Sequence, residues 1–96
     1  MNLIAIGTNH KYSPIELREK ISFPKKRIKD ALDFLMACKT IRGAVILSTC
    51  NRAEIYASAE DLASAIKDIG DFISRYHEID RNTLSPYLYI YLSRAL

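Results

Sequence analysis

Apolar positions change their spacing along the chain, and these changes predict a mixture of strands and helices. Short apolar or alternating runs predict strands at residues 3–6, 44–47, 54–58 and 87–91. A helix is predicted to begin at Pro24, with core positions at Ile28, Leu32, Leu35 and Met36. A longer helix is predicted from about Glu60, with one apolar stripe formed by Leu62, Ile66, Ile69, Ile73 and Tyr76.

A brief additional helix is predicted shortly after the first strand. Gly7 is expected to end that strand. Ser13 is the expected N-cap, Pro14 occupies the first helical position, and Glu16 completes a capping box. We therefore expect a short helix that ends at about Lys20.

Three other positions affect the later elements. Gly70 lies inside the long helix and weakens it by about 1 kcal/mol relative to alanine, which packing would have to offset. Asn51 is expected in a hairpin turn because asparagine tolerates left-handed backbone angles. Residues 82–86 are predicted to form a loop before the last strand.

The order strand, helix, strand, strand, helix, strand predicts the fold class. It is typical of an α+β, ferredoxin-like domain, a split βαβ arrangement with a four-stranded antiparallel sheet covered by helices. In this fold the first and second strands run in the same direction with the third between them. Asn9 and His10, Thr49 and Cys50, and the start of the third strand at Arg52 are therefore expected at one edge of the sheet.

Cys50 is the strongest candidate for chemistry. It follows the apolar run 44–47 at the point where the chain becomes polar, through Thr49, Asn51 and Arg52. A cysteine nucleophile needs a rigid, accessible position and a nearby cation that favours the thiolate. The alternative is that Cys50 is a small apolar residue at a strand end.

The neighbours of Cys50 each have a functional and a structural interpretation. Arg52 could hold a carboxylate with two hydrogen bonds, or it could be exposed or paired with Glu54. Thr49 could bind a polar substrate or cap the turn, and Asn51 could be present only for its backbone. His10 is the candidate base if it reaches Cys50, although a lone histidine after a strand is often structural.

Two further residues are expected to be structural. His77 is expected to interact with the C-terminus of the long helix. Cys38, near the end of the helix that begins at Pro24, is expected to pack rather than react.

Composition limits the remaining possibilities. The chain has 96 residues, a net charge of +3 and two cysteines, which predicts one small domain without a disulfide scaffold. The cysteine spacing does not fit a metal site, and the three isolated glycines form no recognisable phosphate loop. No signal peptide or membrane span is evident, so a cytoplasmic location is expected. Basic residues gather at Lys25, Lys26, Arg27 and Lys29, either as a solvated face or as a nucleic-acid contact.

Two segments carry a resemblance to a known family. The sequence from Gly7 to Glu19, GTNHKYSPIELRE, closely resembles the opening motif of glutamyl-tRNA reductase, with Ser13 where most members have alanine. The sequence from Ser48 to Tyr56, STCNRAEIY, resembles the catalytic segment of that family, with Ala53 at a variable position. The resemblance covers nearly the whole chain.

The resemblance implies an oxidoreductase of tetrapyrrole (porphyrin) biosynthesis. In that family a cysteine, here Cys50, attacks the ester of glutamyl-tRNA, and NADPH reduces the resulting thioester to glutamate-1-semialdehyde. Thr49, Asn51 and Arg52 would then hold the glutamyl group, with Arg52 on a carboxylate. His10 is retained as an accessory candidate because of its position after the first strand.

The resemblance also predicts what this chain does not supply. Members of the family continue into an NADPH-binding domain and a helical domain that forms a homodimer. Residues 1–96 are therefore expected to be an incomplete N-terminal catalytic domain that accepts the acyl group without binding NADPH. A functional histidine that follows the last strand in the family is also absent from this sequence.

A non-catalytic RNA-binding module is the alternative function. Ferredoxin-like sheets can stack bases on strand aromatics, and Tyr87, Tyr89 and Tyr91 are predicted to share one strand face. Their exposure distinguishes the two functions, because tyrosines buried in a core cannot stack on bases.

Overall fold

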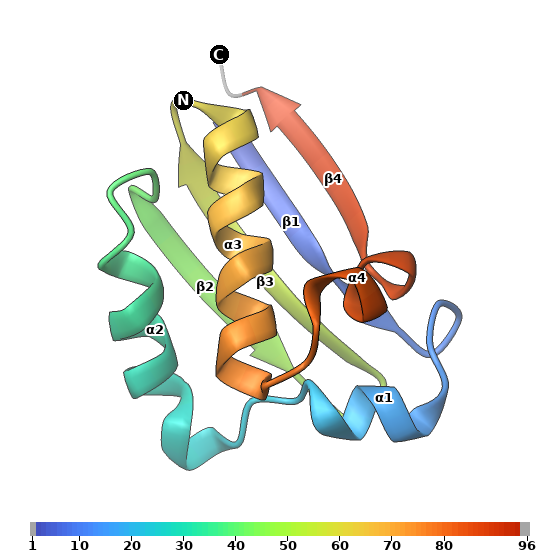
Figure 1. Cartoon of the computed structure of the whole chain (residues 1–96). Coiled ribbons are helices and arrows are strands. Elements are labelled where there is room, and N and C mark those ends of the chain that lie inside the picture. The colour runs from blue at the N-terminus through green and yellow to red at the C-terminus, as the bar shows by residue number, and fades with distance from the viewer. Residues whose placement is uncertain (1, 95–96) are drawn as a thin grey trace.

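The computed structural model describes residues 2–94, which form a four-stranded antiparallel sheet with helices packed on it (Figure 1). Its strands are β1 (Asn2–Asn9), β2 (Gly43–Ser48), β3 (Arg52–Ala59) and β4 (Tyr89–Arg94), in the spatial order β2-β3-β1-β4. Every neighbouring pair is antiparallel, so β1 and β2 run in the same direction with β3 between them. This confirms the predicted ferredoxin-like fold.

The helices lie between the strands in sequence. They are α1 (Ile15–Lys20), α2 (Ile28–Met36), α3 (Leu62–His77) and α4 (Arg81–Leu84), with 3-10 turns η1 (Lys25–Arg27) and η2 (Ser85–Tyr87). In Figure 1, α2 and α3 lie side by side on one face of the sheet, and α1 lies across its lower end. Within residues 2–94, no helix combines the length and apolarity needed to cross a bilayer.

The core lies between the sheet and these helices. Alternate strand residues such as Ile6 and Ile55 face Leu35 of α2 and Ile69 of α3, and all four are almost fully buried. Burying one such side chain contributes about 1.5–3 kcal/mol, so this face accounts for much of the stability. Cys38 is half-buried against this core, and burial raises the pKa of its thiol, consistent with a packing role.

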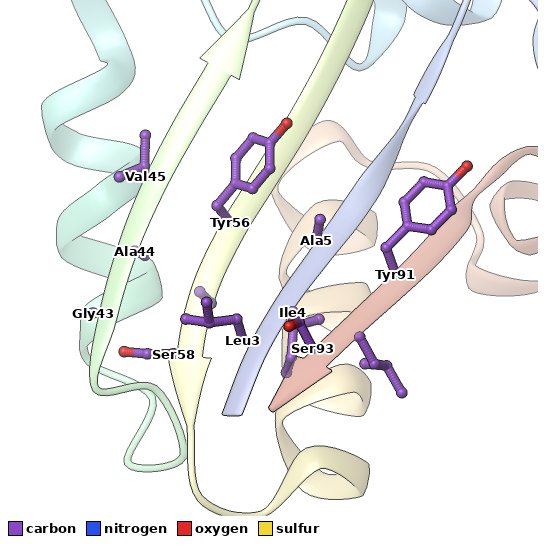
Figure 2. Close-up of a pocket in the computed structure, with 12 residues that line it drawn as sticks. Leu3, Ile4, Ala5, Gly43, Ala44, Val45, Tyr56, Ser58, Tyr91 and Ser93 are labelled. Atoms are coloured by element: carbon purple, nitrogen blue, oxygen red, sulfur yellow. The ribbon is translucent and has the colours of Figure 1, made fainter. Parts of the chain in front are cut away.

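The other face of the sheet is not covered by any helix among residues 2–94. Val45, Tyr56 and Tyr91 lie on this face, and Figure 2 shows them around a shallow hollow of about 400 Å³. The exposed fractions of these three side chains range from 40% to 61%. This face of the sheet therefore presents apolar and aromatic side chains to solvent.

Gly7 does not end the first strand, contrary to the sequence prediction. β1 continues to Asn9, and Gly7 pairs with Glu54 of β3. A Cβ at Gly7 would lie 2.3 Å from the carbonyl oxygen of Ala53. The glycine is therefore needed for close approach of two strands rather than for a turn.

The predicted capping box at α1 is also wrong. Pro14 is the N-cap, and no side chain caps this helix. Ser13 is buried instead, and its hydroxyl oxygen accepts a hydrogen bond of 3.0 Å from Thr8. Tertiary packing of the turn onto β1 has overridden the local capping signal.

The predicted helix from Pro24 divides into two pieces. η1 comes first and α2 begins at Ile28, while Met36 is 42% exposed rather than in the core. The longer helix α3 begins two residues later than expected, at Leu62, where Asp61 accepts a hydrogen bond from the backbone N–H of Ser64.

The segment between α3 and the last strand is helical rather than a loop. Asp80 accepts hydrogen bonds from the backbone N–H groups of Asn82 and Thr83, and so caps α4. Because α4 and η2 use these residues, β4 begins at Tyr89, two residues later than predicted. Tyr87 consequently lies outside the strand.

Candidate active site

The turn between β2 and β3 holds Cys50 at its tip. The backbone N–H of Thr49 donates to the carbonyl oxygen of Arg52 at 2.8 Å, which closes the turn. The Thr49 hydroxyl oxygen accepts from the N–H groups of Asn51 and Arg52, each at 3.2 Å. Thr49 thus has the capping role that the sequence left open, and Cys50 is exposed on a fixed turn.

Asn51 does not use the backbone property for which it was singled out. Glu78 is the non-glycine residue with a positive φ among residues 2–94, so Asn51 does not adopt the left-handed conformation. Its side chain is exposed beside Cys50.

A pocket of about 370 Å³ opens beside Cys50. Its lining comes from two parts of the chain: Ile15, Arg18, Glu19 and Ser22 in and just after α1, and Ser48, Thr49 and Cys50 at and just after the end of β2. The backbone N–H of Phe23 donates to the Ser48 hydroxyl at 2.9 Å and fastens the segment after α1 to the end of β2. The pocket is therefore made from residues distant in sequence.

Arg18 brings a positive charge to this pocket. One terminal nitrogen of its guanidinium donates to the carbonyl oxygen of Ser13 at 2.7 Å. Its Nε is buried and has no hydrogen-bond partner among residues 2–94. Arg18 and Glu19 are pocket residues that sequence reasoning missed, because only the packing of α1 brings them to the pocket that Cys50 also lines.

Arg52 follows Cys50 closely in sequence but does not line the same pocket. Its Nε lies 3.5 Å from a carboxylate oxygen of Glu54, while its side chain is 51% exposed. The pairing with Glu54 is the structural alternative that the sequence offered. Since only one edge of the guanidinium is used in this way, its outer nitrogens remain accessible.

Glu54 is buried on the helix-free face and is held by tyrosines. The hydroxyl of Tyr56 donates to one carboxylate oxygen at 2.7 Å, and the hydroxyl of Tyr89 donates to the other. Burial, followed by the hydrogen bond to Glu54, raises the pKa of Tyr89 well above its usual range, so this phenol remains a donor. The network fixes the position of Glu54 and thereby that of Arg52.

The tyrosines do not form the predicted base-stacking platform. Tyr87 lies on η2, and Tyr89 is only 7% exposed beneath the ring of Tyr12, with ring centroids 4.9 Å apart. Of the two tyrosines that lie in β4, only Tyr91 is exposed. The arrangement expected for the RNA-binding alternative is therefore absent from the described strand.

His10 lies at the expected edge of the sheet, next to the strand pair that leads to Cys50. It follows Asn9, which pairs with Arg52, and its side chain is exposed. Within residues 2–94 no hydrogen bond joins His10 to Cys50. The topology thus brings the two residues to one edge, and the role of His10 as a base stays a prediction.

His77 packs differently from the prediction. Its ring meets Phe23 edge-on at 4.7 Å between centroids, in an aromatic group that includes Tyr76. Burial lowers the pKa of His77 to about 4. The imidazole is therefore neutral near pH 7 and supplies no charge to the helix end.

The glycines and the metal-ligating side chains of the described residues do not gather into a recognisable site. Gly7 lies within β1, Gly43 begins β2 and Gly70 lies within α3, so these glycines do not form a phosphate-binding loop. Over the range 2–94, no three His, Cys, Asp or Glu side chains gather where they could hold a metal ion.

Fold and pocket together define a class of protein: a ferredoxin-like α+β domain with an exposed cysteine in a charged pocket. Residues 6–95 match the family model described as glutamyl-tRNAGlu reductase, N-terminal domain. The chain belongs to this family.

Individual relatives agree with the family match. The glutamyl-tRNA reductase of Geotalea uraniireducens is 41% identical over 95 residues, covering 99% of this chain and 22% of the relative. That of Alkalilimnicola ehrlichii is 43% identical over 91 residues, covering 95% of this chain and 20% of the relative. A solved structure of the glutamyl-tRNA reductase from Methanopyrus kandleri matches with a TM-score of 0.59 and 26% identity, covering 97% of this chain and 19% of that one. The chain thus spans about a fifth of the length of these relatives.

Proposed function

We propose that this chain carries the acyl-accepting site of a glutamyl-tRNA reductase, with Cys50 as the nucleophile. One observation carries the proposal: Cys50 is exposed on a hydrogen-bonded turn and lines a pocket that holds both a cation and an anion. Family membership supports the choice of substrate in this proposal, the glutamyl ester of a tRNA. In this role residues 1–96 serve as the N-terminal catalytic domain of a longer enzyme.

The proposed step is a transfer of the glutamyl group from oxygen to sulfur. The sulfur of Cys50 attacks the ester carbonyl carbon, a C–S bond forms, and the C–O bond to the terminal ribose breaks. The thiol proton ends on the released ribose oxygen, so the products are a Cys50 thioester and free tRNA. Covalent capture of this kind divides one difficult reaction into two easier steps.

The charges near Cys50 match those of the glutamyl group. This group carries an α-ammonium and a side-chain carboxylate, while Arg18 and Glu19 supply one opposite charge each. The accessible nitrogens of Arg52 are proposed to pair with the substrate carboxylate, as the resemblance implies. In the same proposal the turn residues Thr49 and Asn51 hold the glutamyl group, and His10 assists from the same edge.

The second half of the family reaction, the reduction of the thioester, is not assigned to the described residues. NADPH provides the hydride in the reaction implied by the resemblance, but residues 2–94 form no recognisable loop for it. The proposal for this chain therefore ends at the thioester. Binding of NADPH and homodimer formation are proposed only for a longer protein with the further domains of the family.

The transfer of the glutamyl group from tRNA to the protein tests the proposal. Glutamyl-tRNA labelled in its glutamate is mixed with excess protein without NADPH, and label is followed from RNA to protein. The wild-type chain and a Cys38→Ser variant should both accept label, because Cys38 packs against the core. A Cys50→Ser variant should accept none as a thioester. Equal labelling of the two serine variants would overturn the proposal.

A further inference from the structure

A group of exposed basic residues lies on the segment that borders the Cys50 pocket. Lys20 ends α1, and Lys25, Lys26 and Arg27 form η1, all exposed to solvent. We call these four residues the basic turn. None of them forms an ion pair with another residue in the range 2–94.

The charged residues on the adjoining helices α1 and α2 are less suited to binding a phosphate group. Lys29 pairs with Asp33 at 3.3 Å. On α1, Glu16 and Glu19 would repel a phosphate group, so an approaching polyanion is favoured on the η1 side. On the α2 side, Asp30 is an exposed acidic residue in the first turn, and the four residues of the basic turn leave a local excess of positive charge beside it.

The structure fixes how far the basic turn lies from the nucleophile. Phe23 is hydrogen-bonded to Ser48, Lys25 is two positions after Phe23, and Cys50 is two positions after Ser48. Because two residues extend at most about 7 Å, the backbones at Lys25 and Cys50 are within about 20 Å of each other. A few nucleotides of single-stranded RNA span that distance.

We propose that the basic turn binds phosphates of the tRNA 3′ end while its terminal ester lies at Cys50. This inference rests on the proposed function, because it takes the substrate to be an aminoacyl-tRNA. Phosphate contacts of this kind give affinity and position without reading sequence. The basic turn would hold the strand beside the pocket, and the pocket would recognise the glutamyl group.

A binding measurement tests the contact independently of the chemistry. Fluorescently labelled, uncharged tRNA is titrated with the chain, and the dissociation constant is followed by anisotropy over roughly 50–200 mM salt. Lys26→Glu is compared with Lys39→Glu, since Lys39 is exposed in the turn after α2, at the other end of the sheet from Cys50. The two variants carry the same net charge.

The salt dependence should separate these variants. Each lost phosphate contact lowers the slope of log K against log salt by about 0.7–0.9. Lys26→Glu should show one such decrease, Lys25→Glu/Lys26→Glu about two, and Lys39→Glu none. If all three slopes equal that of the wild type, the basic turn does not contact RNA and the inference is wrong.

A second experiment connects the contact to acyl transfer. Acylation of Cys50 is measured with glutamyl-tRNA and with a small glutamate α-thioester, which transfers its acyl group to Cys50 and releases its own thiol. In Lys25→Glu/Lys26→Glu, the ratio of the tRNA rate to the small-thioester rate should fall on the order of tenfold. An unchanged ratio would contradict the inference. Failure of wild-type Cys50 to accept an acyl group from either donor would instead reject the proposed function, and the salt slopes would still decide the RNA contact.

Discussion

Two buried glycines should differ in how much stability they lose when each is replaced by alanine. A Cβ at Gly7 would lie 2.3 Å from the carbonyl oxygen of Ala53, and a Cβ at Gly70 would lie 2.2 Å from a guanidinium nitrogen of Arg81. The first contact is with backbone inside a paired sheet. The second is with the flexible end of a long side chain, which can move away.

The expected magnitudes follow from this difference. Overpacking in Gly7→Ala should cost about 1–3 kcal/mol. About 0.5–1 kcal/mol of this is offset because alanine loses less conformational entropy on folding than glycine. In Gly70→Ala, alanine adds about 1 kcal/mol of helix propensity. Displacing Arg81 weakens its 3.7 Å pairing with Asp71, and a partly exposed pair contributes up to about 1 kcal/mol. Gly7→Ala should therefore lose roughly 1–2 kcal/mol, while Gly70→Ala stays close to the wild type.

Urea unfolding monitored by far-ultraviolet circular dichroism measures both variants in the same way. For a domain of this size, the loss in Gly7→Ala corresponds to a decrease in Tm of about 4–16 °C. Equal midpoints for Gly7→Ala and the wild type would refute the strand-contact argument. A loss in Gly70→Ala as large as that in Gly7→Ala would refute the claim that Arg81 moves at little cost.

Three further variants examine the networks around the site. Tyr89→Phe removes a buried hydrogen bond to Glu54 and should lower the free energy of unfolding by about 1.5–3 kcal/mol in urea titrations; no change would mean that the carboxylate finds another donor. The pKa of His77 falls from 6.5 to about 4 on folding, so the unfolded chain binds more protons and stability should decrease as pH falls from 6.5 toward 4. His77→Phe should remove this part of the pH dependence of unfolding, and an unchanged profile would assign it to other groups. Arg18→Gln should slow transfer from glutamyl-tRNA to Cys50 about tenfold in single-turnover assays, because the pocket loses its cation; an unchanged rate would exclude Arg18 from substrate binding.

Hydrophobic spacing predicted the strands and helices along the chain, because it shows which face of each element is buried. The alternation around Ile55 and the stripe around Ile69 both appear in the core. From the order of elements, the convergence of the chain near Asn9 with the start of β3 at Arg52 followed directly, and the register confirms it.

Features that depend on tertiary contacts were harder to predict. Ser13 occurs in a sequence typical of a helix N-cap, but its hydroxyl oxygen accepts a hydrogen bond from Thr8 instead. Arg18 occurs in an ordinary amphipathic pattern, and only the packing of α1 against the β2–β3 turn brings it to the pocket. Tyr89 is buried because Tyr12, far away in sequence, covers it. No local pattern encodes these long-range pairings.

Intact-mass spectrometry tests the central claim, that Cys50 accepts the glutamyl group, most directly. The folded chain is mixed with glutamyl-tRNA in the absence of NADPH, beside a Cys50→Ser control, and the mass of each protein is recorded during the first turnover. We predict a single glutamyl adduct on the wild-type chain, located at Cys50 by peptide mapping, and no thioester adduct on the control. A folded wild-type chain that remains unmodified while the tRNA ester stays intact would contradict the account.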